Sequence, residues 1–366
     1  EKPLRFNWQT PILLSSHNQD ILYMGSNFLH RSMNQGETWE KISEDLTQGA
    51  KEGNVAFGTI STISESKFQF GLLYAGSDDG KIHVSKDGGA TWQLISYNLP
   101  QNFWVSRIVA SAHKKERVYA TLNGYRNDVF EPFVFVSEDF GANWKAISTG
   151  LTNAVNVIVE DSANENILYV GTDYGLFISL DKGTSWQDFS NGMPNVAVHD
   201  MVIQTKAKEL VVGTHGRSIY KIALSKVQEL TDVVLKKSLH LYDIDNRTKS
   251  DRWGNKGYAW GEVNAPSQTI WYYSNSAEVI NYTITNEAGI VVFVDKFTAQ
   301  KGLNSIVYDY AISKELADKW NKKDKKVKLK EANDKKIYLP IGKYKLVISK
   351  DKQIESKSFE ITAPKK

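Results

Sequence analysis

Short apolar runs separated by turn-forming residues follow one another along the chain. In one block the runs are VSRIVAS (105–111), VYATLNG (118–124), PFVFVS (132–137) and WKAIS (144–148). They are rich in β-branched and aromatic residues, and Gly, Asn, Asp and Ser lie between them, which is typical of β-strands joined by turns. The next block repeats the pattern with VNVIVE (155–160), ILYVGT (167–172), LFISL (176–180) and WQDFS (186–190). Each block therefore predicts a sheet of four strands.

Two motifs recur with these blocks. The first, called the box below, reads SMNQGETW (32–39), SKDGGATW (85–92), SEDFGANW (137–144) and SLDKGTSW (179–186), with tryptophans 53, 52 and 42 residues apart. The second precedes it as ILYMGS (21–26), LLYAGSDDG (72–80) and ILYVGTDYG (167–175), and a fifth block has LVVGTHG (210–216) without a box. Repeats of 40–55 residues rich in short strands are the signature of propeller blades. Residues 1–230 are therefore predicted to form about five β-propeller blades in an all-β protein.

The box residues have a mechanical interpretation in each blade. Their aspartates can accept backbone N–H bonds within the turn between the third and fourth strands, and their glycines supply a conformation that side chains resist. The tryptophans are expected to fill the seams between neighbouring blades. Because every blade would need this turn, we interpret these residues as structural rather than catalytic: Asn34, Asp87, Asp139, Asp181, Trp39, Trp92, Trp144 and Trp186.

The pattern changes beyond residue 238, where the box is absent. Seven runs follow at 240–244, 269–274, 279–286, 290–297, 304–312, 343–349 and 356–362, which predict a β-sandwich of the Ig-like kind over 231–366. An aromatic cluster there could stack on sugar rings or pack a seam between the domains, and we favour the seam: Trp253, Tyr258, Trp260, Trp271, Tyr272 and Tyr273.

Charge divides the chain at the same place. Residues 1–230 carry 20 basic and 25 acidic side chains, whereas residues 231–366 carry 25 and 17. Ten lysines lie in 314–336, but five carboxylates dilute them, so we interpret this segment as a solvated insertion rather than a nucleic-acid site.

The sequence lacks the residues that several classes of chemistry require. The chain of 366 residues has no cysteine, which excludes a disulfide framework, a thiolate zinc site and a cysteine nucleophile. It has no apolar run of the ~18–20 residues that a membrane span needs. It also has no phosphate-binding glycine loop and no serine-nucleophile elbow. No metal and no cofactor is expected.

The boxes resemble the Asp-box, or BNR, repeats of sialidases, xyloglucanase-type glycoside hydrolases and sortilin-type propellers. RFNWQTPI (5–12), WVSRIVAS (104–111), 156–186 and 198–220 resemble more specifically the bacterial sortilin-like group labelled "glycosyl hydrolase, BNR repeat". The resemblance covers most of 4–222. It departs in Asn34, which replaces the box Asp, and in Asn143, which replaces the usual Thr.

The resemblance has implications for the whole protein. It implies that these blades are the C-terminal half of a ring of about ten, and that a FlgD-like, Ig-type module follows them. The missing blades would come from the same precursor or a partner chain. It also implies a secreted, periplasmic or cell-surface protein.

Blade geometry places one set of polar and aromatic residues at the end opposite the boxes, near the channel mouth. Loops on a rigid scaffold are where ligand contacts usually lie. The candidate ligand-binding residues are Trp104, Arg107, Tyr125, Arg126, Tyr174, His199, His215 and Arg217. His199 and His215 do not have the separation of a metal motif that we can justify.

Two function classes remain open. The first is a sortilin-like binding protein that holds a peptide, protein or glycan on the channel face. The second is a sialidase- or xyloglucanase-like glycoside hydrolase, which needs two carboxyls roughly 5–9.5 Å apart. Asp200, Asp173 and Asp128 are the candidates for that pair, but the arginine motif of sialidases is absent. The fold hosts both classes, and the lack of an acid/nucleophile motif favours binding.

Overall fold

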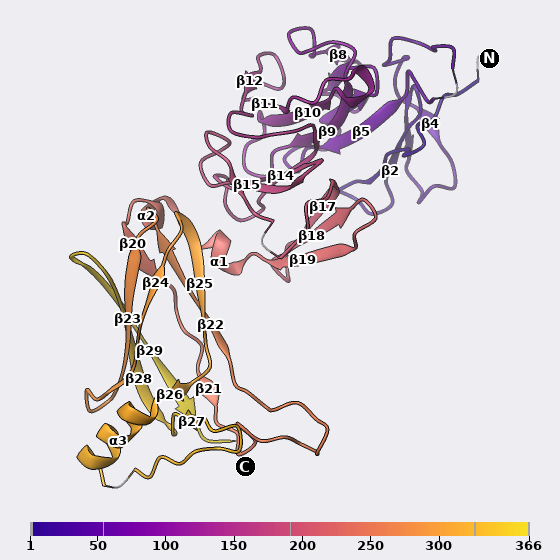
Figure 1. The fold of residues 1–366 in the computed structure, drawn as a ribbon. Coiled ribbons are helices and arrows are strands. Elements are labelled where there is room, and N and C mark those ends of the chain that lie inside the picture. Colours follow the sequence, from indigo (N-terminus) through magenta and orange to yellow (C-terminus); the bar gives the residue numbers. More distant parts are fainter. Residues whose placement is uncertain (1–2, 54, 191, 326, 365–366) are drawn as a thin grey trace. The chain divides into compact units, whose positions relative to one another are not determined.

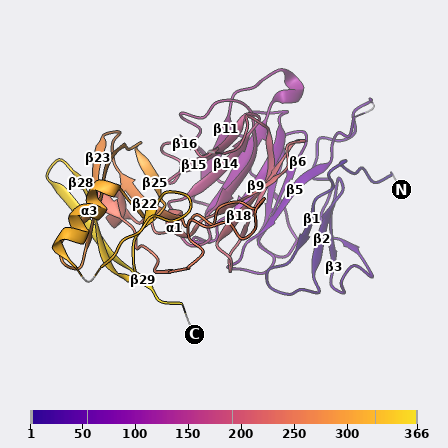
Figure 2. The ribbon, with the colours of Figure 1, turned by 60° about the horizontal axis from the view of Figure 1, so that its bottom comes forward.

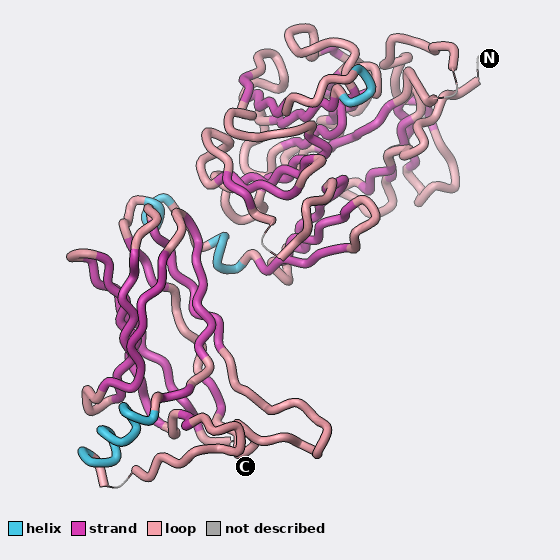
Figure 3. The backbone as a smooth tube through the Cα atoms, viewed as in Figure 1, coloured by secondary structure: helices cyan, strands magenta, loops and turns pink. Residues whose placement is uncertain are grey.

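A computed structural model describes residues 3–53, 55–190, 192–325 and 327–364 of the chain (Figure 1). It divides the chain into two compact units, Glu1–Gln228 and Glu229–Lys366. The boundary expected from sequence, between residues 230 and 231, lies two residues away. Strands dominate both units, and helices are few and short (Figure 3).

The first unit consists of five antiparallel sheets in chain order, which are propeller blades (Figures 1 and 2). Blade 1 contains β1 (Ile12–Leu14), β2 (Leu22–Gly25), β3 (Leu29–Ser32) and β4 (Glu40–Lys41). Blade 2 contains β5 (Ile60–Glu65), β6 (Leu73–Ser77), β7 (Ile82–Ser85) and β8 (Gln93–Leu94). Blade 3 contains β9 (Trp104–Ala110), β10 (Val118–Asn123), β11 (Phe133–Ser137) and β12 (Lys145–Ala146).

The last two blades complete the series. Blade 4 contains β13 (Val155–Glu160), β14 (Leu168–Thr172), β15 (Gly175–Ser179) and β16 (Gln187–Asp188). Blade 5 has three strands, β17 (Val198–Gln204), β18 (Glu209–Thr214) and β19 (Ile219–Ala223), followed by α1 (Ser225–Gln228). A short 3-10 helix, η1 (Tyr125–Asn127), follows β10. The prediction of about five blades is confirmed.

The first strand of each blade contacts the first strand of the next, in the order β1, β5, β9, β13 and β17. Apolar clusters fill the seams between them, and each cluster combines residues of two neighbouring blades. Glycine in the second strand makes this close approach possible. A Cβ on Gly76 would lie 2.5 Å from Val105 Cγ1, and one on Gly171 would lie 2.6 Å from Val198 Cγ1. The recurring glycine of the second motif is therefore required by packing.

The box turns close each of the first four blades. In the second box, Asp87 accepts a bond from the Thr91 backbone N–H at 2.9 Å, and Ser85 donates to it at 2.8 Å. The tryptophan then reaches the preceding blade. The indole N–H groups of Trp92, Trp144 and Trp186 donate to the carbonyl oxygens of Ile42, Ile95 and Ile147, at 2.9, 2.8 and 2.6 Å. Among the described residues, no blade precedes blade 1, where Trp39 lies.

A buried glutamate that the sequence interpretation missed links neighbouring blades at two of the seams. Glu65 of blade 2 accepts bonds from Ser15 and from the Tyr23 hydroxyl of blade 1, at 2.6 and 3.0 Å. Glu160 of blade 4 repeats these contacts with Ser111 and Tyr119 of blade 3. All of these side chains are buried, so each glutamate satisfies polar groups that water cannot reach.

The second unit is a two-layer sandwich. One sheet has the order β20 (Leu239–Leu241), β22 (Gln268–Ser274), β25 (Gly302–Tyr308). The other has the order β21 (Arg247–Thr248), β29 (Gln353–Thr362), β28 (Gly342–Lys350), β23 (Val279–Asn286), β24 (Val291–Thr298). The remaining elements are α2 (Asp232–Leu235), β26 (Ala311–Ile312), α3 (Lys314–Lys323) and β27 (Ile337–Tyr338). One hydrophobic cluster combines residues of both sheets, so they share a core.

The lysine-rich insertion differs in part from the fully solvated segment that the sequence suggested. Its first half forms α3, and Ser313 caps the helix by accepting a bond from the Leu316 backbone N–H. Ala317 and Trp320 are buried in the core of the sandwich. Because the segment is so rich in lysine, its amphipathic helix was not recognised from the sequence. In the described residues, no helix has the length and apolar character that crossing a membrane requires.

Candidate functional site

A groove of about 1340 Å³ lies along the first strands of the blades. All five blades contribute to it, together with the loop before β5 and the loop that contains η1. It is called the central groove below. Six of the eight predicted ligand-binding residues line it: Trp104, Arg107, Tyr125, Arg126, His199 and His215. Asp128 and Asp200, from the carboxylate candidates, line it too.

A β-bulge at the same register in blades 2 to 5 shapes the groove. The pairing of the first and second strands shifts at Ser61, Ser106, Asn156 and His199. All four residues line the groove. Bulges re-aim a side chain and are over-represented beside active sites. Ser61 and Ser106 donate to the Val105 and Val155 carbonyl oxygens of the next blade, at 2.7 and 2.9 Å. The bulges thus both join the blades and place polar groups on the groove wall.

One wall combines an aromatic ring with an arginine. The Arg126 guanidinium lies over the Trp104 ring, 4.6 Å from its centroid, and donates to the Ala56 carbonyl at 3.3 Å. It also lies 3.7 Å from the carboxylate of Asp78. Asp78 is fully buried and accepts two bonds from Thr59. Burial raises the pKa of Asp78, and the bonds from Thr59 oppose the rise. Arg126 thus joins the η1 loop to blade 2.

Within the groove, an ion pair joins blade 3 to blade 5. Arg107 Nη2 donates to Asp200 Oδ1 at 2.6 Å. The same oxygen accepts a bond from the Met201 backbone N–H at 2.8 Å. Arg107 Nε is buried and has no hydrogen-bond partner among the described residues. Asp200, which the sequence offers as a catalytic candidate, is therefore ion-paired with an arginine.

Blade 5 contributes two histidines to the groove. The rings of His199 and His215 lie 5.1 Å apart between centroids, at an angle of 38°. Burial and the neighbouring His215 lower the pKa of His199, while Asp173 opposes this effect. The lowered pKa favours the neutral form of the His199 imidazole. Within the described part of the chain, no three His, Asp or Glu side chains form a group that could hold a metal.

Three predicted residues do not line the groove. Tyr174 and Arg217 are exposed beyond its walls. Asp173 reaches it only indirectly, because it accepts a bond at 2.9 Å from the amide of Asn156, which lines the groove. Asn156 in turn accepts a bond from the Asn123 amide at 2.9 Å. The carboxylate candidate Asp173 is thus part of an amide network between blades 3 and 4.

Sequence reasoning also missed groove residues. Asp78 and Asn123 occupy the same register as Asp173 and His215. This position directly follows the second strand in three blades and is its last residue in blade 3. Aligning the second motif across all five blocks would have found them. The loop residues 51–53 and 55–57 and Trp8 carry no such signal, because they lie outside the repeated motifs. Only the fold brings them to the groove.

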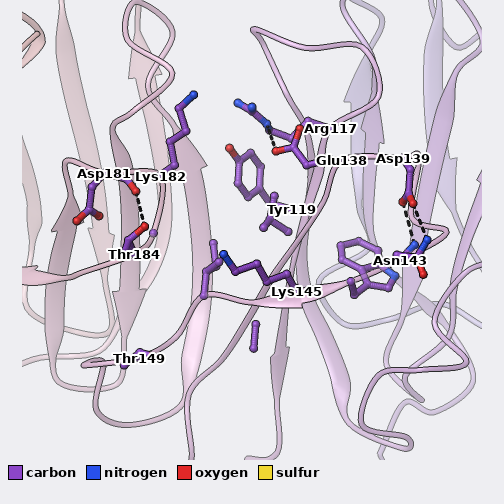
Figure 4. Close-up of a pocket in the computed structure, with 15 residues that line it drawn as sticks. Arg117, Tyr119, Glu138, Asp139, Asn143, Lys145, Thr149, Asp181, Lys182 and Thr184 are labelled. Carbon is purple, nitrogen blue, oxygen red and sulfur yellow. Dashed lines mark hydrogen bonds and ion pairs between the residues drawn. The ribbon is translucent and has the colours of Figure 1, made fainter. Parts of the chain in front are cut away.

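A second pocket of about 660 Å³ lies between the boxes of blades 3 and 4 (Figure 4). Its main cation, Arg117, donates to Glu138 at 2.7 Å and to Glu165 at 3.0 Å. Burial alone would lower the pKa of Arg117, but the bonds to these carboxylates raise it above its usual value. Asp139 and Asp181 also line the pocket, and both are engaged in their box turns. Arg117, Glu138 and both aspartates are thus engaged in structural contacts, so the central groove is the better candidate site.

No family model and no curated protein matches this chain. Its fold is similar to those of solved β-propeller structures. An ancestral GH74 enzyme is 16% identical with a TM-score of 0.48, and the match covers 82% of this chain and 39% of that one. YCF48 bound to D1 peptide is 14% identical with a TM-score of 0.42, covering 56% and 61%. PorZ, a surface component of the type-IX secretion system of Porphyromonas gingivalis, is 12% identical with a TM-score of 0.44, covering 97% and 51%. At these identities the likeness concerns the fold alone.

Proposed function

We propose that this chain is a sortilin-like binding protein of the cell exterior, and that the central groove holds an extended peptide or glycan. The observation that supports this best is the composition of the groove. All five blades contribute to one continuous surface, which combines aromatic rings, amides and charges of both signs. A footprint of this length suits a chain-like ligand better than a small molecule.

The carboxylates of the groove favour binding over hydrolysis. A glycosidase needs one carboxyl as acid and a second as base or nucleophile. Asp200 forms an ion pair with Arg107. Asp78 is buried and accepts a hydrogen bond from the Thr59 hydroxyl. Asp128 lies in a left-handed backbone conformation directly after η1, at φ 56°. A glycoside hydrolase that uses Asp128, Asp173 and Asp200 is the alternative, and the test below includes it.

Binding can be tested with two probe collections, a display library of random twelve-residue peptides and an array of purified oligosaccharides. Wild type is compared with Trp104→Ala and Arg126→Ala. The proposal expects enriched ligands whose affinity falls by about tenfold or more in both variants. Tyr97→Ala is the control, because Tyr97 is an exposed aromatic residue outside the groove. Its binding should equal that of wild type.

The competing function has its own readout. If the protein releases reducing sugar from xyloglucan or a sialoside, and Asp128→Asn or Asp200→Asn abolishes that release, the hydrolase is correct. Ligands whose affinity is unchanged in both groove variants would place the binding surface elsewhere.

We also propose that further blades, from the same polypeptide or a partner chain, cover the two outer blade faces. Ile219 pairs with Gly213 in blade 5, as Leu29, Ile82 and Leu176 pair with glycines in blades 1, 2 and 4. Those three side chains are 0% exposed, whereas Ile219 is 72% exposed.

The other face shows the same contrast. Ile12 of blade 1 occupies the register of Ile108 and Ile158. It is 64% exposed, whereas they are 2% and 0% exposed. Both faces are thus built as seams, and a neighbouring blade is the partner that matches them.

Location outside the cytoplasm is part of the same proposal. The cysteine-free sequence, the terminal sandwich and the resemblance stated above support it. Fractionation of cells that express the complete gene product is the measurement. Recovery of the product in the cytosolic fraction would contradict this part of the proposal.

A further inference from the structure

We infer that the hairpin between β21 and β22 of the second unit is a carbohydrate-binding site, at which the Trp260 indole stacks on a pyranose ring. This inference does not depend on the function proposed for the central groove. It rests on a pair of aromatic side chains that the core of the sandwich does not use.

The hairpin is an ordered element. Lys256 and Val263 form an antiparallel bridge, and the Asn264 backbone N–H donates to the Asn255 carbonyl at 3.0 Å. A turn closes the tip, where the Gly261 N–H donates to the Tyr258 carbonyl at 3.0 Å. In Figure 1 the segment between β21 and β22 extends away from the two sheets of the sandwich.

The base of the hairpin is anchored in the core. Trp253 is buried, stacks on Tyr310 at 5.5 Å between ring centroids, and meets Tyr338 edge-on at 5.9 Å. Lys249 Nζ lies 4.3 Å from the Trp253 ring centroid. The Gly254 carbonyl also accepts a bond from the Asp334 backbone N–H at 3.1 Å. These contacts fix the direction of the hairpin, so its tip is presented at a defined position.

The tip presents two aromatic rings to solvent. Trp260 is 86% exposed and Tyr258 is 59% exposed, the first being the highest value among the exposed large apolar side chains described. Their ring centroids lie 4.4 Å apart. A Cβ on Gly261 would come within 2.8 Å of the Tyr258 ring, so glycine there allows the tyrosine to lie across the turn. The Tyr258 ring thus lies beside the indole at an interplanar angle of 47°, and most of the Trp260 surface stays exposed.

The chemistry of the tip favours a neutral sugar. Lys256 and Glu262 carry one charge of each sign, so the tip does not attract an anionic membrane or polymer. A pyranose ring with equatorial substituents presents C–H groups on its flat faces, which an electron-rich indole face attracts. Glu262 and Asn264 are exposed on the same hairpin and can hydrogen-bond sugar hydroxyls. We therefore assign chains of neutral pyranoses with equatorial substituents as the ligand class.

The test is co-sedimentation of the full chain with insoluble cellulose and with chitin. Wild type should bind at least one of these polymers. Trp260→Ala should weaken that binding by about tenfold or more, and Trp260→Phe should retain most of it, because a smaller ring still stacks. Trp260 is exposed, so both variants should melt at the wild-type temperature, which circular dichroism checks.

Tyr97→Ala is the matched control, because Tyr97 is an exposed aromatic residue outside both the hairpin and the central groove. It should leave polymer binding unchanged, whereas Trp8→Ala reports any glycan binding in the central groove. Loss of binding in Trp8→Ala with normal binding in Trp260→Ala would move the glycan site to the groove and overturn the inference. Absence of binding to both polymers would overturn it as well. So would binding to phosphatidylcholine vesicles that Trp260→Ala removes, since that result identifies a lipid surface.

Discussion

The hydroxyls of the buried second-strand tyrosines have different hydrogen-bond partners from one seam to the next. Ala110 occupies the register of Glu65 and Glu160, so the seam between blades 2 and 3 has no carboxylate at this place. Tyr74 is the counterpart of Tyr23 and Tyr119. Among the described residues, its buried hydroxyl has no hydrogen-bond partner. The three tyrosines occupy equivalent positions, but only Tyr23 and Tyr119 donate to a glutamate.

This difference predicts unequal costs for the same substitution. Tyr119→Phe removes a bond to the buried carboxylate of Glu160 and should lower the free energy of unfolding by about 1.5–3 kcal/mol. Tyr74→Phe removes an unpaired hydroxyl and should change it by less than about 0.5 kcal/mol. Urea denaturation measures both variants. Equal losses would show that the carboxylate bond contributes nothing to the seam.

The box aspartates predict a particular response to acid. The bonds from the Thr91 hydroxyl, the Thr91 backbone and Ser85 lower the pKa of Asp87 from 3.8 to about 2. A carboxyl whose pKa is depressed by folding stabilises the protein above its unfolded pKa, and this contribution is lost as the pH falls from near 4 through 2.

Asp87→Asn should therefore reduce the loss of stability between pH 4 and pH 2. Thermal melts at the two pH values measure this loss. Asn34, which replaces the aspartate in the first box, does not titrate and serves as an internal reference, so Asn34→Asp should make the loss steeper. An unchanged pH response in Asp87→Asn would contradict the assigned bonds.

At the scale of the strand, the requirement for glycine in the second strand depends on whether a neighbouring blade packs against that position. Gly76→Ala would place its Cβ 2.5 Å from Val105 Cγ1 of the next blade. We expect a loss of about 1–3 kcal/mol from overpacking. Gly213 holds the same register in blade 5, and its Cβ would meet nothing closer than the Asp200 carbonyl at 3.5 Å. Gly213→Ala should therefore cost nothing in this chain.

Denaturant unfolding of the two variants measures this contrast. A large loss in Gly213→Ala would mean that the face of blade 5 is already covered. In a complex that contains a further blade, Gly213→Ala should become disruptive, in the same way as Gly76→Ala.

At the scale of the whole molecule, the two exposed faces predict association. A solution of the full chain should form oligomers as its concentration rises, because Ile12 and Ile219 lose contact with water when the faces meet. Ile219→Lys and Ile12→Lys should reduce the mass measured by light scattering. Val294→Lys, an exposed substitution in the sandwich, is the control and should not. A monomer at about 100 μM, unaffected by either face variant, would contradict the prediction.

The sequence by itself determined the class of fold, because repeated boxes and short β-rich runs are local signals. It indicated the number of blades, the box turns and the position where the sandwich begins. Six of the eight ligand-binding residues that it selected line the groove, since blade periodicity assigns each loop to one end.

Only the tertiary structure decided how those residues are used. Arg107 and Asp200 are 93 residues apart in sequence, and only the arrangement of the blades makes them an ion pair. Asp173 bonds an amide instead of lining the groove, and Trp260 extends into solvent while Trp253 is buried in the same hairpin. The physical reason is that burial and pairing depend on distances through space, which a pattern along the chain does not contain.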